Sequence, residues 1–165
     1  MIIRWEKVDK AVDKVHNQTF MLIGEYLHTI DQKNRLSVPS KFRKELGKRI
    51  VVTRGLDRCL FLYSVDEWKV FAEKLLANLP WGKADARSFQ RTMIAGAMDC
   101  EIDALGRILL PDYLKQYCNI SDEAIIVGLY RRVEIWNPEL WKQYSEGAQR
   151  QTEVIAEKLG ELGMY

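Results

Sequence analysis

The chain is poor in the residues that build metal centres and disulfide frameworks. Its 165 residues include three cysteines and two histidines, with no Cys-x-x-Cys pair and no zinc-ligand spacing among them. An odd number of widely spaced cysteines favours reduced, structural thiols over a disulfide framework. We therefore expect no metal site, no cofactor, and cysteines that serve core packing.

A long hydrophobic run is also missing. No segment approaches the roughly 18 apolar residues that cross a bilayer, and charges interrupt the apolar residues of the first 20 positions. We expect no membrane contact, no secretion signal and a cytoplasmic location. Residues 1–20 are interpreted as an N-terminal extension before a second methionine, Met21, and no function is assigned to them.

Motifs of common enzyme active sites are missing as well. The sequence contains no Gly-x-Ser-x-Gly, no phosphate-binding loop and no His-Glu-x-x-His. Asp31 and Asp103 could form a carboxylate pair, but each has an arginine four positions later, which would lower its pKa and leave a poor general acid. We therefore predict that the chain is not an enzyme.

The formal net charge is only +2, but the charge is unevenly distributed. Residues 31–58 include nine basic and three acidic residues, residues 103–132 include four of each sign, and residues 133–165 include three basic and six acidic residues. The basic segment is compatible with a protein face that contacts a polyanion such as nucleic acid.

The most informative feature is an internal repeat. "DQKNRLSVP" at 31–39 and "DALGRILLP" at 103–111 share the spacing Asp-x-x-x-Arg-x-x-x-Pro. A shift of 72 or 73 residues relates the pairs Gly24–Gly96, Ile30–Ile102, Asp31–Asp103, Arg35–Arg107, Pro39–Pro111, Gly55–Gly128, Leu56–Leu129, Arg58–Arg131, Trp68–Trp141 and Lys69–Lys142. Ordered matches of this number indicate two tandem copies. We expect the first copy at 21–94 and the second at 95–165.

Each copy has the same predicted local structure around its motif. Apolar segments flank a three-residue loop whose last position is Asn34 or Gly106, and both residue types tolerate the left-handed conformation of such loops. We expect the aspartate and arginine to lie opposite each other across a tight hairpin. A short helix follows, with Ser40 as its N-cap in the first copy and Pro111 or Asp112 at its start in the second.

Two further strands and a longer helical region complete each copy. The strand segments are "RIVVTR" and "CLFLYS" in the first copy, and "AIIVGL" and "VEIWN" in the second. Helices are predicted from Ser64 to Pro80, over 84–97, and from Pro138 with an interruption near Gly147. An apolar stripe along the last helix fits either the core or a neighbouring subunit; it comprises Leu140, Trp141, Tyr144, Val154, Ile155, Leu159 and Leu162.

The Asp-x-x-x-Arg motif allows two interpretations. The aspartate can accept backbone N–H groups of the turn while the arginine clamps it, as a purely structural ion pair worth about 0–1 kcal/mol when exposed. Alternatively, it orients a guanidinium that contacts guanine edges or phosphates. Lys33, Arg35 and Arg107 would then face a DNA duplex. Lys41 and Arg43 suit phosphate contacts, although a solvated helix face explains each of them equally well.

Four segments together resemble the MraZ family of the SpoVT–AbrB-like superfamily, over residues 21–141. They are "MLIGEYLHTIDQKNRLSVPSKFRKELG", "GLDRCLFLY", "GAMDCEIDALGRILLPDYLKQY" and "VGLYRRVEIWNPELW". The resemblance implies an α+β, β-rich fold, a double-split, swapped-hairpin β-barrel made of two tandem AbrB-like repeats with outer helices. One departure is Asn34, where the family usually has glycine.

The resemblance also implies a function and its residues. The DNA-binding residues would be Asp31 and Arg35, and Asp103 and Arg107, with Lys33, Lys41 and Arg43 in the first signature stretch. The family members are transcriptional regulators, mainly repressors, of the bacterial division and cell-wall gene cluster. They assemble into octameric or larger rings and bind short boxes that occur as direct repeats in double-stranded DNA. We therefore expect a cytoplasmic, nucleoid-associated homo-oligomer.

Two alternatives to this function stay open. One is a ring-forming interaction protein whose Asp-x-x-x-Arg motifs are purely structural. The other is an antitoxin-like module of the same superfamily that binds both DNA and a toxin. The second full repeat and the lack of a disordered toxin-binding tail argue against the antitoxin-like module.

Overall fold

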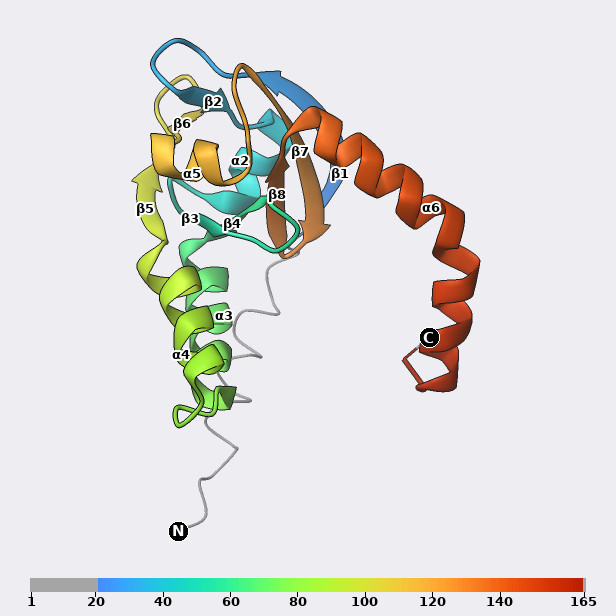
Figure 1. The fold of residues 1–165 in the computed structure, drawn as a ribbon. Helices are drawn as coiled ribbons and strands as arrows, with labels where there is room; N and C mark the ends of the chain where they lie inside the picture. Colours follow the sequence, from blue (N-terminus) through green and yellow to red (C-terminus); the bar gives the residue numbers. More distant parts are fainter. Residues whose placement is uncertain (1–20, 165) are drawn as a thin grey trace.

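A computed structural model describes residues 21–164, so the predicted N-terminal extension lies outside the described residues. Its strands form a six-stranded antiparallel sheet and a separate two-stranded sheet, with helices around them (Figure 1). The strands are β1 (Leu22–Thr29), β2 (Arg35–Ser37), β3 (Arg49–Arg54), β4 (Leu60–Ser64), β5 (Met98–Glu101), β6 (Arg107–Leu109), β7 (Glu123–Tyr130) and β8 (Arg132–Trp136). The helices are α2 (Ser40–Leu46), α3 (Val65–Asn78), α4 (Ala84–Gln90), the π-helical turn η1 (Arg91–Ala95), α5 (Asp112–Tyr117) and α6 (Pro138–Glu161). The predicted α+β, strand-rich class is confirmed.

The two copies exchange their first strands. The large sheet has the order β1-β7-β8-β4-β3-β5, so β1 of the first copy pairs with β7 of the second, and β5 of the second pairs with β3 of the first. Equivalent strands pair with each other at the centre of the large sheet, β4 with β8, and in the small sheet, β2 with β6. Because of this exchange the copies share one sheet, and the repeat boundary between residues 94 and 95 stays a prediction.

The predicted hairpins form only at their turns. Next to the first turn, Ile30 and Leu36 form a single antiparallel bridge, and beyond it the two strands enter different sheets. The prediction of two continuous local hairpins was therefore wrong, because pairing with the other copy replaces local pairing. In residues 21–164 the two sheets are not joined into a closed hydrogen-bonded barrel, so the implied barrel is supported only as far as its strand exchange.

The main core lies against one face of the large sheet and contains side chains from both copies. Its fully buried members include Leu36 and Ile108 from the small sheet, Phe42 from α2 and Leu114 from α5. Alternation along β2 and β6 places these apolar residues inward, which leaves the neighbouring positions on the outer face of the small sheet. The core thus fixes which face of β2 and β6 solvent can reach.

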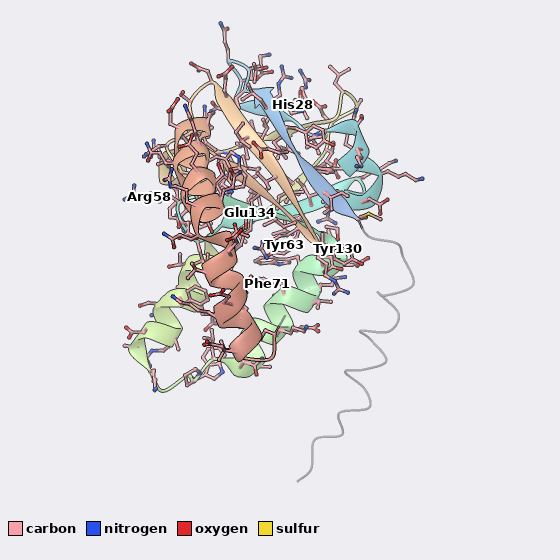
Figure 2. The ribbon with its side chains drawn as sticks, turned by 90° about the vertical axis from the view of Figure 1, so that its right-hand side faces the viewer. His28, Arg58, Tyr63, Phe71, Tyr130 and Glu134 are labelled. Carbon is pink, nitrogen blue, oxygen red and sulfur yellow. The ribbon has the colours of Figure 1, made fainter. Side chains whose placement is uncertain are left out.

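A second apolar cluster covers part of the opposite face of the large sheet. Tyr63 of β4 stacks on Phe71 of α3 with ring centroids 5.2 Å apart (Figure 2), and at the equivalent positions Trp136 of β8 packs on Tyr144 of α6 at 5.1 Å. α3 begins where the sequence predicted, and Ser64 is its N-cap, since its Oγ accepts a hydrogen bond from the Glu67 N–H. The first turns of α3 and α6 are therefore anchored to the sheet by equivalent aromatic contacts.

Two helix predictions were wrong in detail. Ser40 is the first residue of α2 and caps nothing; Pro39 precedes the helix, and the fixed φ of proline suits a helix start. α6 runs without interruption through Gly147, since packing of its first turns and helix-forming neighbours outweigh a single glycine. α6 is therefore one continuous helix of 24 residues.

The cysteines are packing residues for the most part, as predicted. Cys59 and Cys118 are buried, Cys100 is half-buried, and none of the three forms a disulfide. Burial raises the pKa of Cys100 to about 11 and that of Cys118 to about 12, so both thiols stay protonated and unreactive at neutral pH.

Within residues 21–164, no helix combines the length and apolar character needed to cross a membrane.

Candidate nucleic-acid interface

The first Asp-x-x-x-Arg motif is a tight, fully bonded turn. Oδ1 of Asp31 accepts hydrogen bonds from the backbone N–H of Lys33 at 2.9 Å and of Arg35 at 3.0 Å. Oδ2 accepts from Nε of Arg35 at 2.8 Å and lies 2.7 Å from its Nη2. Asn34 takes the left-handed conformation with φ 58°, as predicted for the last loop position.

The second motif repeats this geometry. Oδ1 of Asp103 accepts from the N–H groups of Leu105 and Arg107, both at 2.9 Å. Its Oδ2 accepts from Nε of Arg107 at 2.9 Å and lies 2.7 Å from Nη2. Gly106 has φ 79°. The prediction that aspartate and arginine lie opposite each other across a turn is confirmed in both copies.

Pairing of β2 with β6 brings the two turns together. Arg35 pairs with Leu109, and Ser37 pairs with Arg107, so both arginines lie on the outer face of this small sheet. Nη1 of Arg107 is 3.7 Å from Oδ2 of Asp31, which links the motifs across the two copies. The side chains of Arg35 and Arg107 keep 32% and 22% of their surface exposed. The four motif residues therefore form one cluster, which we call the arginine ribbon.

The carboxylates of the arginine ribbon are strongly held in the charged form. Hydrogen bonds from the Arg35 side chain lower the pKa of Asp31 to about 2, and the equivalent contact with Arg107 lowers the pKa of Asp103. Since the pKa in the folded state is lower than in the unfolded chain, these carboxylates stabilise the turns above about pH 4. The contribution of Asp31 is lost as the pH falls from about 4 towards 2, and that of Asp103 is lost as the pH falls below the ordinary pKa of an aspartate.

Titration of Asp31 provides a direct test of the turn geometry. We expect an NMR titration midpoint near pH 2 for its carboxyl in the folded protein, below the ordinary aspartate pKa of 3.8. Arg35→Ala should raise this midpoint towards the ordinary pKa because the charged hydrogen bond is gone. Arg49→Ala is a matched control, since Arg49 pairs with Asp99 on another strand. An Asp31 midpoint that Arg35→Ala leaves unchanged would contradict the geometry.

Each turn is also supported by the short helix of the other copy. Asn34 donates from Nδ2 to Oδ1 of Asp112 at 2.8 Å, and its Oδ1 accepts from Nζ of Lys115 at 2.7 Å. On the other side, Arg43 of α2 packs so closely on Gly106 that a Cβ there would collide with its guanidinium. The departure to asparagine at position 34 is thus used structurally, since its side chain bonds to α5.

These contacts between the copies change the interpretation of Arg43, which the sequence suggested as a phosphate contact. Arg43 is half-buried against the second turn, and its Nε is buried without a hydrogen-bond partner. Lys33 and Lys41 are exposed, as phosphate contacts require. Asp112 and Lys115 were missed as neighbours of the turn. The shift of 72 residues could have identified Lys115, because it is the position equivalent to Arg43.

The arrangement suits recognition by hydrogen bonding. Each arginine fork is fixed by a carboxylate on one side, while its outer side faces solvent on a two-stranded ribbon. Fixed, charged donors of this type bind guanine edges or phosphates with little further loss of side-chain entropy.

Within residues 21–164, no cluster of three or more histidine, cysteine, aspartate or glutamate side chains could hold a metal ion.

Comparison with known proteins places this geometry in a family. The family model described as "MraZ protein, putative antitoxin-like" matches twice, over residues 21–92 and 93–159. A protein of Caldanaerobacter subterraneus named "Transcriptional regulator MraZ" is 51% identical over 139 residues, which cover 84% of this chain and 96% of the relative. Relatives of the same name from Thermoanaerobacter pseudethanolicus and Desulfitobacterium hafniense are each 51% identical over 144 residues, covering 87% of this chain and 100% of the relative. With two tandem matches in one chain and identity at this level over most of its length, the chain belongs to the MraZ family.

Proposed function

We propose that the chain is a transcriptional regulator that binds double-stranded DNA sequence-specifically through the arginine ribbon. The observation that carries this proposal is the junction of the two motifs, with Nη1 of Arg107 3.7 Å from Oδ2 of Asp31 across the copies. A structural turn clamp needs only its own aspartate and arginine. Two clamped arginines side by side on the outer face of a β-ribbon form a surface of the size that enters a major groove.

The residues around the ribbon divide the contacts between phosphate and base. Lys33 on the first turn and Lys41 on α2 are exposed cations beside it, placed for the DNA backbone. The second turn carries Leu105, which is 70% exposed, and Leu109 lies opposite Arg35. Apolar side chains at such positions can contact the methyl groups of thymine. The first copy therefore supplies most of the charge, and the second supplies apolar contacts.

The proposed assembly and target rest on the resemblance to the family. The chain is proposed to act as a cytoplasmic, nucleoid-associated repressor of the division and cell-wall gene cluster, as an octameric or larger ring that binds direct-repeat boxes. A chain of net charge +2 makes few phosphate contacts alone. Several copies that engage neighbouring boxes together multiply weak contacts into tight binding, provided that box spacing matches subunit spacing.

Unbiased capture of genomic DNA tests the function. Purified protein is incubated with sheared genomic DNA at physiological salt, and the retained fragments are sequenced. We expect enrichment of a few promoters that contain repeated short boxes. Assembly without retention of any fragment would instead favour an interaction protein with structural motifs. Retention that requires a second, toxin-like protein would favour the antitoxin-like alternative. The description of the matching family model also uses the term antitoxin-like.

Lys41→Ala tests the phosphate contacts. Since Lys41 is exposed on α2 and outside the turns, the substitution should weaken binding to all sequences alike. The slope of log K against log salt should become shallower by about 0.9 for each phosphate that a subunit no longer neutralises. Affinity is measured by fluorescence anisotropy between 50 and 200 mM salt, roughly the range over which such slopes are resolved. Lys142→Ala, on the acidic C-terminal region, is the control, and an unchanged slope for Lys41→Ala would remove it from the interface.

A further inference from the structure

Every polar group of Asn34, on the backbone and on the side chain, is hydrogen-bonded. Its N–H donates to the Asp31 carbonyl at 2.9 Å, and its own carbonyl accepts from the Leu110 N–H at 2.9 Å. The side-chain amide donates from Nδ2 to Oδ1 of Asp112 at 2.8 Å and accepts, through Oδ1, from Nζ of Lys115 at 2.7 Å. The bond to Asp31 closes the turn, and the other bonds connect the turn to the second copy.

The second turn shows which of these bonds a turn of this type requires. Gly106, at the equivalent position, donates from its N–H to the Asp103 carbonyl at 2.8 Å, and its carbonyl accepts from the Val38 N–H at 2.8 Å. Arg43 packs on Gly106, but its Nε has no hydrogen-bond partner. The turn and its backbone bond to the other copy thus form with glycine, so the side-chain bonds of Asn34 are an addition.

These added bonds connect the two chain segments that carry the arginines of the ribbon. Arg35 directly follows Asn34 in the chain. Asp112 begins α5 and follows Arg107 of β6 by five positions. α5 lies beside the small sheet formed by β2 and β6 (Figure 1). Each end of the link therefore adjoins one arginine, and the link restrains the spacing of the two guanidinium groups in addition to the strand pairing.

We propose that Asn34, Asp112 and Lys115 are positioning residues that determine how well the arginine ribbon discriminates between DNA sequences. We call these three residues the turn brace. The inference rests on the proposed DNA-binding function and deepens it. Two base contacts act together only when both donors fit the same duplex, so a displaced arginine weakens specific binding. Contacts with phosphates depend on charge and carry no sequence information, so they tolerate such a displacement.

Charge and exposure distinguish the turn brace from a direct DNA contact. Lys115 is half-buried with its ammonium bound to Asn34, whereas Lys33 and Lys41 are exposed. Asp112 carries the opposite charge to Lys115, so the turn brace adds no net charge to the DNA-binding surface. We therefore expect it to affect specific binding and to leave sequence-independent binding unchanged.

Asn34→Gly removes the side-chain bonds and keeps the turn, because glycine adopts the left-handed conformation freely. Competition gel shifts with operator and random DNA measure both affinities. We expect operator affinity to fall about tenfold, within the range that one bidentate base contact contributes, and affinity for random DNA to change by less than about twofold. Asn119→Gly is the matched control, since Asn119 has φ 52° and lies beyond the end of α5. Unchanged discrimination by Asn34→Gly would overturn the proposal.

Lys115→Met separates positioning from direct contact. Methionine keeps an unbranched stem but cannot donate to Asn34. Alone, this substitution should lower operator affinity; combined with Asn34→Gly it should add nothing further, because Lys115 acts through the amide. A further loss in the double variant, or a shallower salt slope for random DNA, would mean that Lys115 contacts phosphate itself and would overturn the positioning role. Gln116→Ala, at an exposed neighbouring position on α5, is the control.

An exchange of the amide and the carboxylate tests the bond itself. Asn34→Asp places a carboxylate opposite Asp112, so the donor is lost and discrimination should fall. Adding Asp112→Asn supplies a donor from the other side, while the new carboxylate still accepts from Lys115. We expect the double variant to recover operator affinity to within about threefold of the unaltered chain. If it does not recover while circular dichroism shows folded chains, the turn brace does not act through these bonds.

A measurement without DNA separates this inference from the proposed function. Exchange of the Arg35 Nε–H with water, followed by NMR, reports how firmly the guanidinium is held on Asp31. It should be faster in Asn34→Gly and Lys115→Met than in the unaltered chain, and unchanged in both controls. This result from a chain that retains no DNA contradicts the proposed function alone. Specific binding with neither discrimination nor exchange altered by Asn34→Gly contradicts the inference alone.

Discussion

Arg35→Ala is expected to abolish sequence-specific DNA binding and to leave the fold and the assembly intact. The Arg35 side chain provides two of the bonds to Asp31, while the backbone bonds of the turn stay in place. A good bidentate contact to a base contributes about 1–3 kcal/mol of discrimination. Repeated over several subunits, the loss should reduce specific affinity to the level of non-specific binding.

Two further variants make the Arg35 experiment selective. Arg49→Ala removes an arginine with an aspartate partner, Asp99, from the large sheet, and it should leave specific binding within about twofold. Arg35→Lys keeps the charge but loses the planar fork, so it should retain non-specific binding and lose discrimination. Competition gel shifts with operator and random DNA measure both quantities, and size exclusion monitors assembly. Specific binding by Arg35→Ala would refute the role of the arginine ribbon.

Phe42→Ala is expected to cause the largest loss of stability among single core substitutions. Phe42 is fully buried, contacts the ring of Tyr26 edge-on at 5.3 Å, and belongs to the core shared by both copies. Truncation of a buried phenylalanine costs about 3–5 kcal/mol, a large part of the roughly 5–15 kcal/mol that stabilises a typical domain. Because α2 carries both Lys41 and Phe42, DNA binding should decline together with stability.

The measurement for Phe42→Ala is the denaturant midpoint at one fixed protein concentration, because assembly also stabilises the folded chain. Phe89→Ala is the matched control, since Phe89 on α4 is 36% exposed. It should cost less than about 1 kcal/mol. A loss for Phe42→Ala no larger than that of Phe89→Ala would contradict the burial of Phe42 in the shared core.

Local chemistry could be predicted from the sequence, whereas strand pairing could not. The left-handed conformation of Asn34 and Gly106 and the aspartate–arginine contacts follow from residue types at fixed spacing, and both were found. Neighbouring segments suggested local hairpins. Which strand pairs with which depends on long-range packing between the copies, and no local pattern encodes it. The repeat was visible, but the exchange of β1 and β5 required the structure.

The candidate site was also only partly accessible to sequence reasoning. Exposure of Lys33 and Lys41 agrees with polar residues on a turn and on a helix surface. The position of Arg43 against Gly106 was not predicted, because these two residues are 63 positions apart in sequence. The same reason applies to Lys115 and Asn34. Contacts between distant segments depend on the fold, whereas the basic segment and the family resemblance alone had suggested a DNA contact for Arg43.

The pairing of β4 with β8 and of β2 with β6 has an evolutionary consequence. Antiparallel pairing of two equivalent strands is the arrangement found at the interface of a symmetric homodimer. Here both halves belong to one polypeptide. A fused gene of this kind replaces a concentration-dependent encounter by an intramolecular one. It also frees the halves to diverge. The first turn could acquire Lys33 while the second acquired Leu105, which would be impossible in an obligate dimer of identical chains. Fusion would thus have converted a surface that reads a palindrome into one that reads a direction along the DNA.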